Sequence, residues 1–223
     1  IMPVDSDSTP VPVRVVVVTL DRHLAGPLSE VECRLKAEIP GLSLRLHAAT
    51  DYTADPAALA AAEADIAEAD IVVAAMLFLE EHVTAILPAL AARAEACDAI
   101  VGCISAGEIV KLTRLGDLRM DRPAKGVLGL LKRLRGKPKE GGQASSGQGQ
   151  MKVLRRLPKI LRFIPGKAQD LRAYFLTMQY WLSGSEDNLA NLVRFLIDRY
   201  AAGARAHLRG AVEAAAPVDY PET

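Results

Sequence analysis

Short apolar runs alternate with helical patterns over the first half of the chain. The runs 13–20 (VRVVVVTL), 71–76 (IVVAAM) and 99–104 (AIVGCI) are almost entirely apolar, and β-branched residues dominate the first. Such runs are typical of strands that are buried on both faces of a parallel sheet. The segment 42–47 (LSLRLH) instead alternates apolar and polar residues, which predicts a half-buried strand near a sheet edge.

Helices are predicted in the intervals between these strands. Apolar residues recur at steps of three and four in the segments 24–35, 59–66 and 83–97, which places them on one face of a helix. Four strands that alternate with helices predict an α/β fold, a Rossmann-like parallel sheet with flanking helices and right-handed crossovers. Numbering the strands along the chain, we expect the order 2-1-3-4.

Two further helices are predicted after residue 167. The first, 168–182, stacks apolar side chains on one face and carries Tyr174 and Trp181 to one side. Ser185 is followed by acidic residues, a pattern that predicts the N-cap of the second helix. The apolar stripe over 189–200 indicates that this helix packs against another element.

The sequence divides into five predicted ranges. They are a disordered N-terminus left partly from cloning (1–10), a Rossmann-like α/β domain (11–115), a basic segment with a disordered Gly/Ser/Gln loop (116–150), a helical segment (151–210) and a truncated linker to a further domain (211–223). The loop prediction rests on residues 136–150, where Ala144 is the only apolar residue, because burial there cannot offset the entropy of ordering.

Cysteine usage and run lengths bear on the location of the protein. Cys33, Cys97 and Cys103 have no CxxC spacing, so we expect buried thiols in a reducing compartment. The longest apolar runs are far shorter than the roughly 20 residues that cross a bilayer. We therefore expect a soluble, cytoplasmic protein.

Basic residues are concentrated in one part of the chain. The net charge is zero, yet the range from Lys111 to Arg172 holds 17 Lys or Arg against 4 Asp or Glu. Segregation of this size is typical of a binding face, although solvated charges around a flexible loop would give the same pattern.

The basic range ends in a candidate binding surface. Its residues are Arg155, Arg156, Lys159, Arg162 and Arg172, with Tyr174, Tyr180 and Trp181 nearby. Such a surface could bind carboxylates through charge-assisted hydrogen bonds while the aromatic rings stack on a flat ligand. A partner protein or an anionic membrane would also fit. Nucleic acid is not expected, because the aromatic residues do not follow an RNP-like spacing.

The predicted strand ends offer a second set of candidates, since ligands of open α/β sheets bind outside the carboxyl ends of the strands. His23 follows the first strand, and Glu80 and His82 follow the third; these last two are more simply solvated residues at a helix start. No GxGxxG or Walker motif and no HExxH spacing is present. We therefore predict no catalytic residue and no metal site within this sequence.

A family resemblance emerges in the basic and helical region. Residues 155–185 (RRLPKILRFIPGKAQDLRAYFLTMQYWLSGS), with the amphipathic helix that follows, resemble the N-terminal region of the large H subunit of magnesium chelatase. Residues 11–105 and the closing VDYPE are compatible with the same family. The resemblance implies a ligase that inserts Mg²⁺ into protoporphyrin IX, the first committed step towards chlorophyll or bacteriochlorophyll in photosynthesis. It also implies that the reaction depends on ATP, which two AAA+ type partner subunits hydrolyse.

The resemblance also sets expectations for this part of the enzyme. The fragment should be inactive by itself, should bind no cofactor tightly, and should serve docking and assembly or assist porphyrin binding. Its expected partners are the remaining domains of the H subunit, the two AAA+ subunits and protoporphyrin IX, with peripheral contact at the photosynthetic membrane. The alternatives are a fragment of a cobaltochelatase-type large subunit and a non-enzymatic α/β module that binds a partner or a membrane.

Overall fold

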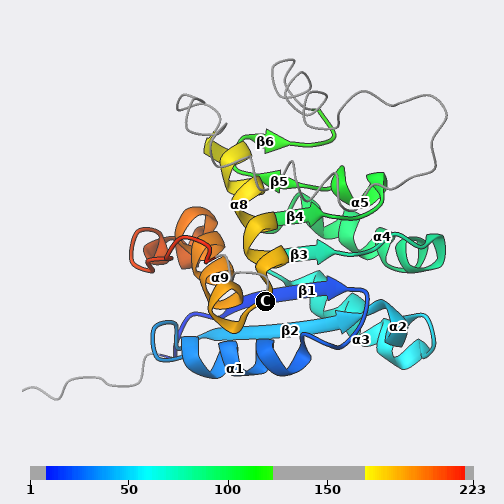
Figure 1. The fold of residues 1–223 in the computed structure, drawn as a ribbon, viewed down its shortest axis with the longest axis horizontal. Helices are drawn as coiled ribbons and strands as arrows, with labels where there is room; N and C mark the ends of the chain where they lie inside the picture. The colour runs from blue at the N-terminus through cyan, green and yellow to red at the C-terminus, as the bar shows by residue number, and fades with distance from the viewer. Residues whose placement is uncertain (1–8, 123–168, 219–223) are drawn as a thin grey trace, which may run out of the picture.

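A six-stranded sheet between two layers of helices forms the centre of the protein (Figure 1). The computed structural model describes residues 9–122 and 169–218. The strands are β1 (Val13–Thr19), β2 (Leu42–Ala48), β3 (Ile71–Ala75), β4 (Ala99–Cys103), β5 (Arg114–Leu115) and β6 (Leu118–Arg119). Their order is β2-β1-β3-β4-β5-β6. Strands β1 to β4 are parallel, so the predicted fold class and the order 2-1-3-4 are confirmed.

The sheet is larger than the four strands predicted. Strands β5 and β6 form an antiparallel hairpin beside β4, which carries the sheet four residues beyond the predicted domain limit at residue 115. Each of the two strands has two residues, too few for an alternating pattern to appear in the sequence. The five predicted ranges stay predictions, and residues 1–8, 123–168 and 219–223 lie outside the described residues.

The helices confirm the main periodicity predictions. They are α1 (Ala25–Leu35), α2 (Ala49–Tyr52), α3 (Pro56–Glu68), α4 (Glu80–Ala94), α5 (Gly107–Val110), α8 (Gln169–Ser183), α9 (Glu186–Tyr200) and the 3₁₀ helix η2 (Gly203–Leu208). The Ser185 hydroxyl accepts a hydrogen bond from the Asn188 N–H (3.2 Å) and caps α9 as predicted. In the described part of the chain, no helix is both long enough and apolar enough to cross a membrane.

The two faces of the sheet are covered by different sets of helices. Val16, Val18 and Val72 face a core shared with α3 and α4, whereas Val17 and Val73 face a core shared with α1, α8 and α9. Because successive residues of a strand point to opposite faces, both faces of a fully apolar strand must be covered. The apolar runs of β1, β3 and β4 are explained by this double burial.

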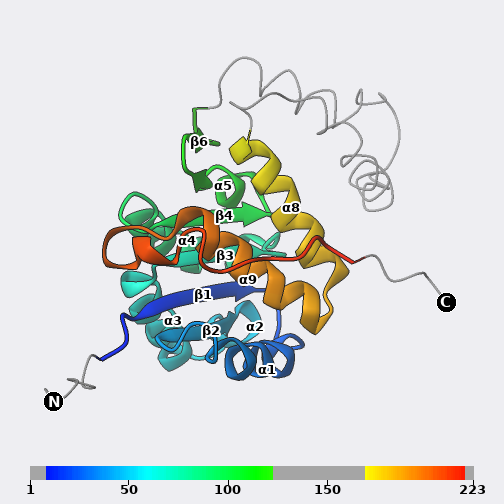
Figure 2. The same cartoon turned by 90° about the vertical axis from the view of Figure 1, so that its left-hand side faces the viewer.

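The helices α8 and α9 fill a gap that the local connections leave. With right-handed crossovers, the order 2-1-3-4 places α3 and α4 on one face and α1 alone on the other. The strands β1, β3 and β4 would then lack cover on the second face. Helix α9 covers this face with an apolar stripe that includes the fully buried Leu189 and Leu196. Figures 1 and 2 show α8 crossing the sheet beside α9.

The amino ends of the strands are fixed by a cluster of buried charges. Asp70 precedes β3 and Asp98 precedes β4, and both carboxylates are 6% exposed. Arg205 of η2 contacts both, at 3.3 Å from Asp70 and 2.8 Å from Asp98. The second Asp70 oxygen accepts the Arg14 N–H at 2.8 Å. This cluster attaches a segment from the end of the described chain to the middle of the sheet.

The segment after η2 runs back across α9 towards α8 (Figure 2). Asn188 exchanges two hydrogen bonds with the backbone of Val218, each 3.0 Å. The Asn191 side chain accepts the Ala215 N–H (3.2 Å), and the Tyr180 hydroxyl donates to the Ala215 carbonyl. These side chains satisfy backbone groups that would otherwise lack partners, so the segment is part of the fold.

Candidate functional site

The carboxyl ends of β3 and β4 meet in a pair of linked turns. Met76 and Ile104, which follow the two strands, have φ angles of 64° and 48°. The Met76 N–H donates to the Ile104 carbonyl (2.9 Å), and the Ala106 N–H donates to the Leu77 carbonyl (2.8 Å). The Leu77 N–H donates to Ser105 Oγ at 3.1 Å. A positive φ costs a non-glycine residue ~1 to 3 kcal/mol, so the surrounding bonds hold both turns in a strained conformation.

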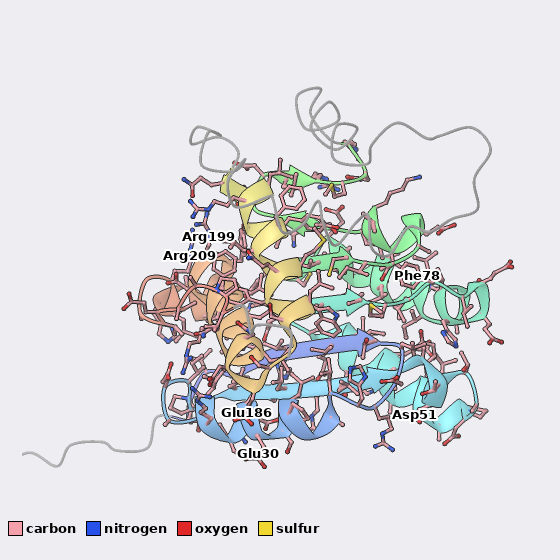
Figure 3. All side chains as sticks on the ribbon, in the orientation of Figure 1. Glu30, Asp51, Phe78, Glu186, Arg199 and Arg209 are labelled. Carbon is pink, nitrogen blue, oxygen red and sulfur yellow. The ribbon has the colours of Figure 1, made fainter. Side chains whose placement is uncertain are left out.

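These turns direct one side chain inward and leave the next two in solvent. Leu77 is fully buried, whereas Phe78 is 56% and Leu79 is 55% exposed. They are the most exposed large apolar side chains in the described residues, and Figure 3 shows Phe78 on the side towards which β1 and β2 point. Ligands of open α/β sheets bind at this edge. The Phe78/Leu79 pair is therefore a candidate docking surface.

The Phe78/Leu79 pair is not among the predicted site residues, although the sequence carries a signal for it. The two residues lie between a buried strand and Glu80, the acidic first residue of α4. An apolar pair at the start of a connecting loop is unusual, because loops at that position are mostly polar. The apolar run of β3 continues into the pair, so that in the sequence Phe78 and Leu79 look like part of the buried strand.

The predicted strand-end candidates do not form one site. His23 is exposed and its Nδ1 contacts the Asp21 carboxylate, while the Glu80 side chain is also exposed. The hydrogen bonds from the His23 side chain and backbone lower the pKa of Asp21. Neither His23 nor His82 has a hydrogen bond or ion pair to Glu80. An acid/base pair is therefore not assembled from these three side chains.

His82 corrects the expectation of a solvated helix start. Its side chain is 6% exposed and its carbonyl accepts a hydrogen bond from the Tyr52 hydroxyl at 2.5 Å. The short helix α2 covers this position, which the sequence pattern did not reveal. No hydrogen-bond partner is present for His82 Nδ1 among the described residues. Burial of the Tyr52 hydroxyl raises the pKa of Tyr52.

The aromatic part of the predicted binding surface is buried. Tyr174, Tyr180 and Trp181 are 4%, 2% and 7% exposed, and the Tyr174 hydroxyl donates to the Gly102 carbonyl at 2.9 Å. The expectation that their rings lie free for stacking is corrected, because α8 is packed against the sheet, α9 and the last described segment. Arg155, Arg156, Lys159 and Arg162 lie outside the described residues, and whether the segment binds a ligand stays a prediction.

Arg172 is the described member of the basic set, and it lies in a groove between α8 and α9. The groove has a volume of about 210 Å³ and is lined by Gln169, Arg172, Ala173, Leu176, Phe195 and Arg199. The Arg199 guanidinium lies 5.8 Å from the centre of the Phe195 ring, within reach of a cation–π interaction. Two guanidinium groups beside apolar side chains could hold a carboxylate on an apolar body. Arg199 is not among the predicted binding residues, because it belongs to the other helix.

A larger hollow lies beside the outer edge of β2. Its volume is about 450 Å³, and its charged lining includes Arg22, Glu32, His47 and Asp51. Glu32 accepts the outward Leu44 N–H at 3.2 Å, and His47 contacts Asp65 at 2.6 Å. The first of these contacts caps an edge-strand group that could otherwise pair with another chain. The arrangement is that of a protected sheet edge.

The thiols differ from one another, and this corrects one prediction. Cys97 and Cys103 are buried as expected, but Cys33 is exposed on α1, because it lies on the helix face opposite Val31 and Leu35. Burial raises the pKa of the Cys103 thiol to about 12, so this thiol stays protonated and unreactive.

Within residues 9–122 and 169–218, no group of three or more His, Cys, Asp or Glu side chains could hold a metal ion.

Comparisons with known proteins relate the chain to one component of an enzyme. A family model described as "Domain of unknown function (DUF3479)" matches residues 14–175. The magnesium-chelatase H subunit of Cereibacter sphaeroides is 53% identical over 208 residues, which cover 93% of this chain and 17% of the relative. The magnesium-chelatase H subunit of Rhodobacter capsulatus is 51% identical with the same coverage.

A plant protein is also similar. The chloroplastic magnesium-chelatase ChlH subunit of Oryza sativa subsp. japonica is 33% identical over 138 residues, which cover 61% of this chain and 10% of the relative. The chain thus spans about a sixth of the length of the bacterial relatives that it matches. The chain belongs to the DUF3479 family, and over nearly all of its length it is similar to a part of the magnesium-chelatase H subunit.

Proposed function

We propose that the chain works as part of the H subunit of a magnesium chelatase. In this proposal the complete subunit binds protoporphyrin IX and inserts Mg²⁺, and two AAA+ type partner subunits supply the energy of ATP hydrolysis. The identity of 53% over 93% of the chain carries the proposal. The chelatase names of relatives from bacteria and from a plant chloroplast support it. A cobaltochelatase is the alternative within the same chemistry.

Within that subunit, we assign this part to docking and assembly. The observation that supports this role is the Phe78/Leu79 pair, which the strained turns hold in solvent at the binding edge of the sheet. A fixed apolar pair costs little conformational entropy on binding, because its backbone is already ordered. The isolated part is proposed to be inactive and to bind no cofactor tightly.

Direct contact with the porphyrin is the second candidate role. The groove between α8 and α9 supports it, because Arg172 and Arg199 lie beside Leu176 and Phe195. Protoporphyrin IX carries two propionates on a flat apolar ring, and each guanidinium can form charge-assisted hydrogen bonds with a carboxylate. The basic residues 155–162 would add to this surface.

A reconstituted chelatase separates the two roles. Arg172→Ala with Arg199→Ala is introduced into the complete H subunit, and the dissociation constant of deuteroporphyrin is measured beside the rate of Mg²⁺ insertion. Contact with the porphyrin predicts that the dissociation constant rises about tenfold or more. A docking role predicts an unchanged dissociation constant. Absence of Mg²⁺ insertion by the unmodified subunit with its partners, or insertion of Co²⁺ in its place, would refute the magnesium chelatase proposal.

A second experiment tests whether the 223-residue chain binds porphyrin without the rest of the H subunit. Trp181 is the single tryptophan, so quenching of its emission reports binding of deuteroporphyrin to the fragment. Saturable quenching that Arg172→Ala with Arg199→Ala removes would favour the porphyrin role. Quenching that does not saturate would contradict it.

The location is proposed to be cytoplasmic, with peripheral contact at the photosynthetic membrane. The basic range 111–172 supports the membrane contact, because lysines and arginines are attracted to anionic lipid surfaces. Pelleting with anionic vesicles tests this. Binding at low salt that disappears at high salt is expected, and absence of binding at low salt would contradict the membrane contact.

A further inference from the structure

We propose that the Phe78/Leu79 pair is the contact through which this part docks against another region of the same H-subunit polypeptide, at an apolar surface with a basic rim. This inference rests on the proposed function, since it requires the chain to be part of a longer H subunit. It goes further by naming the surface, the chemistry of its counterpart and the covalent link between them.

The support of the pair argues for a contact rather than for incidental exposure. Met76 and Ile104 are large side chains with positive φ angles, and Ile104 is β-branched, which makes that conformation especially costly. The hydrogen bonds between the two turns hold Phe78 and Leu79 in solvent. Strain of this kind persists where it serves recognition.

The charges around the pair determine the chemistry of the counterpart. The carboxyl edge carries the acidic residues Asp21, Asp51, Glu80, Glu81 and Glu108, and the basic or titratable residues Arg22, His23 and Lys111. Arg22 is paired with Asp51 at 3.3 Å, and His23 contacts Asp21. Glu80 and Glu81, directly after Leu79, have no basic partner within salt-bridge distance among the described residues except His82, which lies 3.9 Å from Glu81. A counterpart with lysines or arginines around an apolar surface would complement this edge.

The size of the pair argues for a contact within one polypeptide. Stable interfaces between separate proteins bury roughly 800 Å² on each partner, and two partly exposed side chains offer much less. A covalently linked counterpart is present at an effective concentration of about 1 mM, so that a weak contact is still occupied. The bacterial relatives provide such a length of chain, because this chain covers only 17% of each.

The test follows the reaction of a cysteine at the pair with a maleimide. The background carries Cys33→Ser, since Cys33 is the exposed one of the three thiols. Phe78→Cys, and separately Leu79→Cys, is introduced into the 223-residue chain and into the complete H-subunit polypeptide that contains it. Both side chains are more than half exposed, so folding is unaffected. Glu30→Cys, exposed on α1 (Figure 3), is the matched control.

Docking predicts labelling that is about tenfold slower in the complete polypeptide than in the shorter chain, at 78 and at 79, with no difference at 30. Equal rates at all three positions would overturn the proposal. It would also be overturned by protection that appears only when the partner subunits are added, or that grows with the concentration of the shorter chain, because the occupant would then be a separate molecule.

The basic rim has its own readout. Glu80→Gln with Glu81→Gln in the Phe78→Cys polypeptide is expected to raise the labelling rate about threefold at low salt, and high salt should weaken the protection of the unmodified edge. Protection that neither change affects would overturn the basic rim. A complete polypeptide that is protected at 78 but inserts no Mg²⁺ with its partners refutes the proposed function and keeps the contact. A complete polypeptide that inserts Mg²⁺ but is labelled at position 78 at the rate of the shorter chain refutes the contact and keeps the proposed function.

Discussion

The two ends of the strands are built from different chemistry. At the amino ends, Arg205 joins the buried carboxylates of Asp70 and Asp98 and attaches η2 to the sheet. At the carboxyl ends, the backbone turns of β3 and β4 bond to each other and hold the apolar side chains of Phe78 and Leu79 in solvent. Charged groups are buried at the first edge, and apolar groups are exposed at the second.

This difference indicates how the two edges are used. Buried charges contribute to the fold only when their partners are present, so the amino edge depends on every member of its cluster. Exposed apolar groups contribute little to folding, so the carboxyl edge can be changed without unfolding the protein. The amino edge stabilises the domain, whereas the carboxyl edge is available for binding. Four variants test this comparison.

Removal of Arg205 should have the largest effect. In Arg205→Ala, two nearly buried carboxylates lose their common cation, and breaking a buried ion pair costs ~3 to 5 kcal/mol. Urea unfolding followed by Trp181 fluorescence measures the loss. Arg209→Ala, an exposed arginine close by in the sequence (Figure 3), should change the free energy of unfolding by less than ~0.5 kcal/mol. Equal effects of the two variants would show that the amino edge does not depend on its charge cluster.

Thr113→Val should weaken the attachment of the β5–β6 hairpin next to the carboxyl edge. The buried Thr113 hydroxyl accepts the Gly102 N–H (2.9 Å) and donates to the Gly102 carbonyl (3.1 Å). The isosteric valine leaves the buried N–H without a partner, a loss of ~2 kcal/mol, which denaturant unfolding can measure. Thr84→Val, on the exposed face of α4, is the control. A loss as large as that of Arg205→Ala would contradict the smaller role given to this region.

Glu38→Gln should have a small effect that depends on pH. Glu38 lies between α1 and β2, and the hydrogen bond from Arg194 of α9 lowers its pKa from the ordinary value of 4.5. The lowered pKa means that the pair stabilises the fold above pH ~4.5, and that this contribution is lost as the pH falls through the lowered pKa. The pair is partly exposed, so ~0.5 kcal/mol is expected at pH ~7.

Urea unfolding of the native chain and of Glu38→Gln, at pH ~7 and at pH ~3, measures this difference. The native chain should be the more stable of the two at neutral pH, and the two should converge in acid. A difference that persists or grows in acid would mean that the carboxylate does not act through its charge.

Phe78→Ser with Leu79→Ser should have the smallest effect on stability. Both side chains are more than half exposed, so the free energy of unfolding should change by less than ~0.5 kcal/mol. The same unfolding experiment checks this. A loss above ~1.5 kcal/mol would show that the pair packs on this domain, and the contrast between the two edges would then fail.

Much of the fold follows from local patterns. The strands β1, β3 and β4 follow from short, almost entirely apolar runs, which are typical of strands that are buried on both faces of a parallel sheet. Helices α1, α3 and α4 follow from apolar residues at steps of three and four, and the start of α9 follows from Ser185. Each of these signals lies within one element, so a single segment of sequence is enough to read it.

The candidate site was less predictable, because it depends on contacts between distant segments. Tyr174, Tyr180 and Trp181 have the composition of a binding surface, and their burial depends on the sheet and on residues 215–218 packing around α8. The groove of Arg172 and Arg199 joins two helices that sequence analysis treated separately. The strain at Met76 and Ile104 has no signal in the residue types, since neither residue favours a positive φ.

The sequence by itself determined the α/β class, the cap of α9 and the resemblance to the H subunit of magnesium chelatase. These follow from periodicity, from capping chemistry and from shared sequence, all of which are properties of short segments. Only the tertiary structure decided that α8 and α9 close the open face of the sheet, that Arg205 joins Asp70 to Asp98, and that Phe78 and Leu79 stay in solvent. Burial and strain depend on which distant residues surround a side chain, and that is settled only when the whole chain has packed.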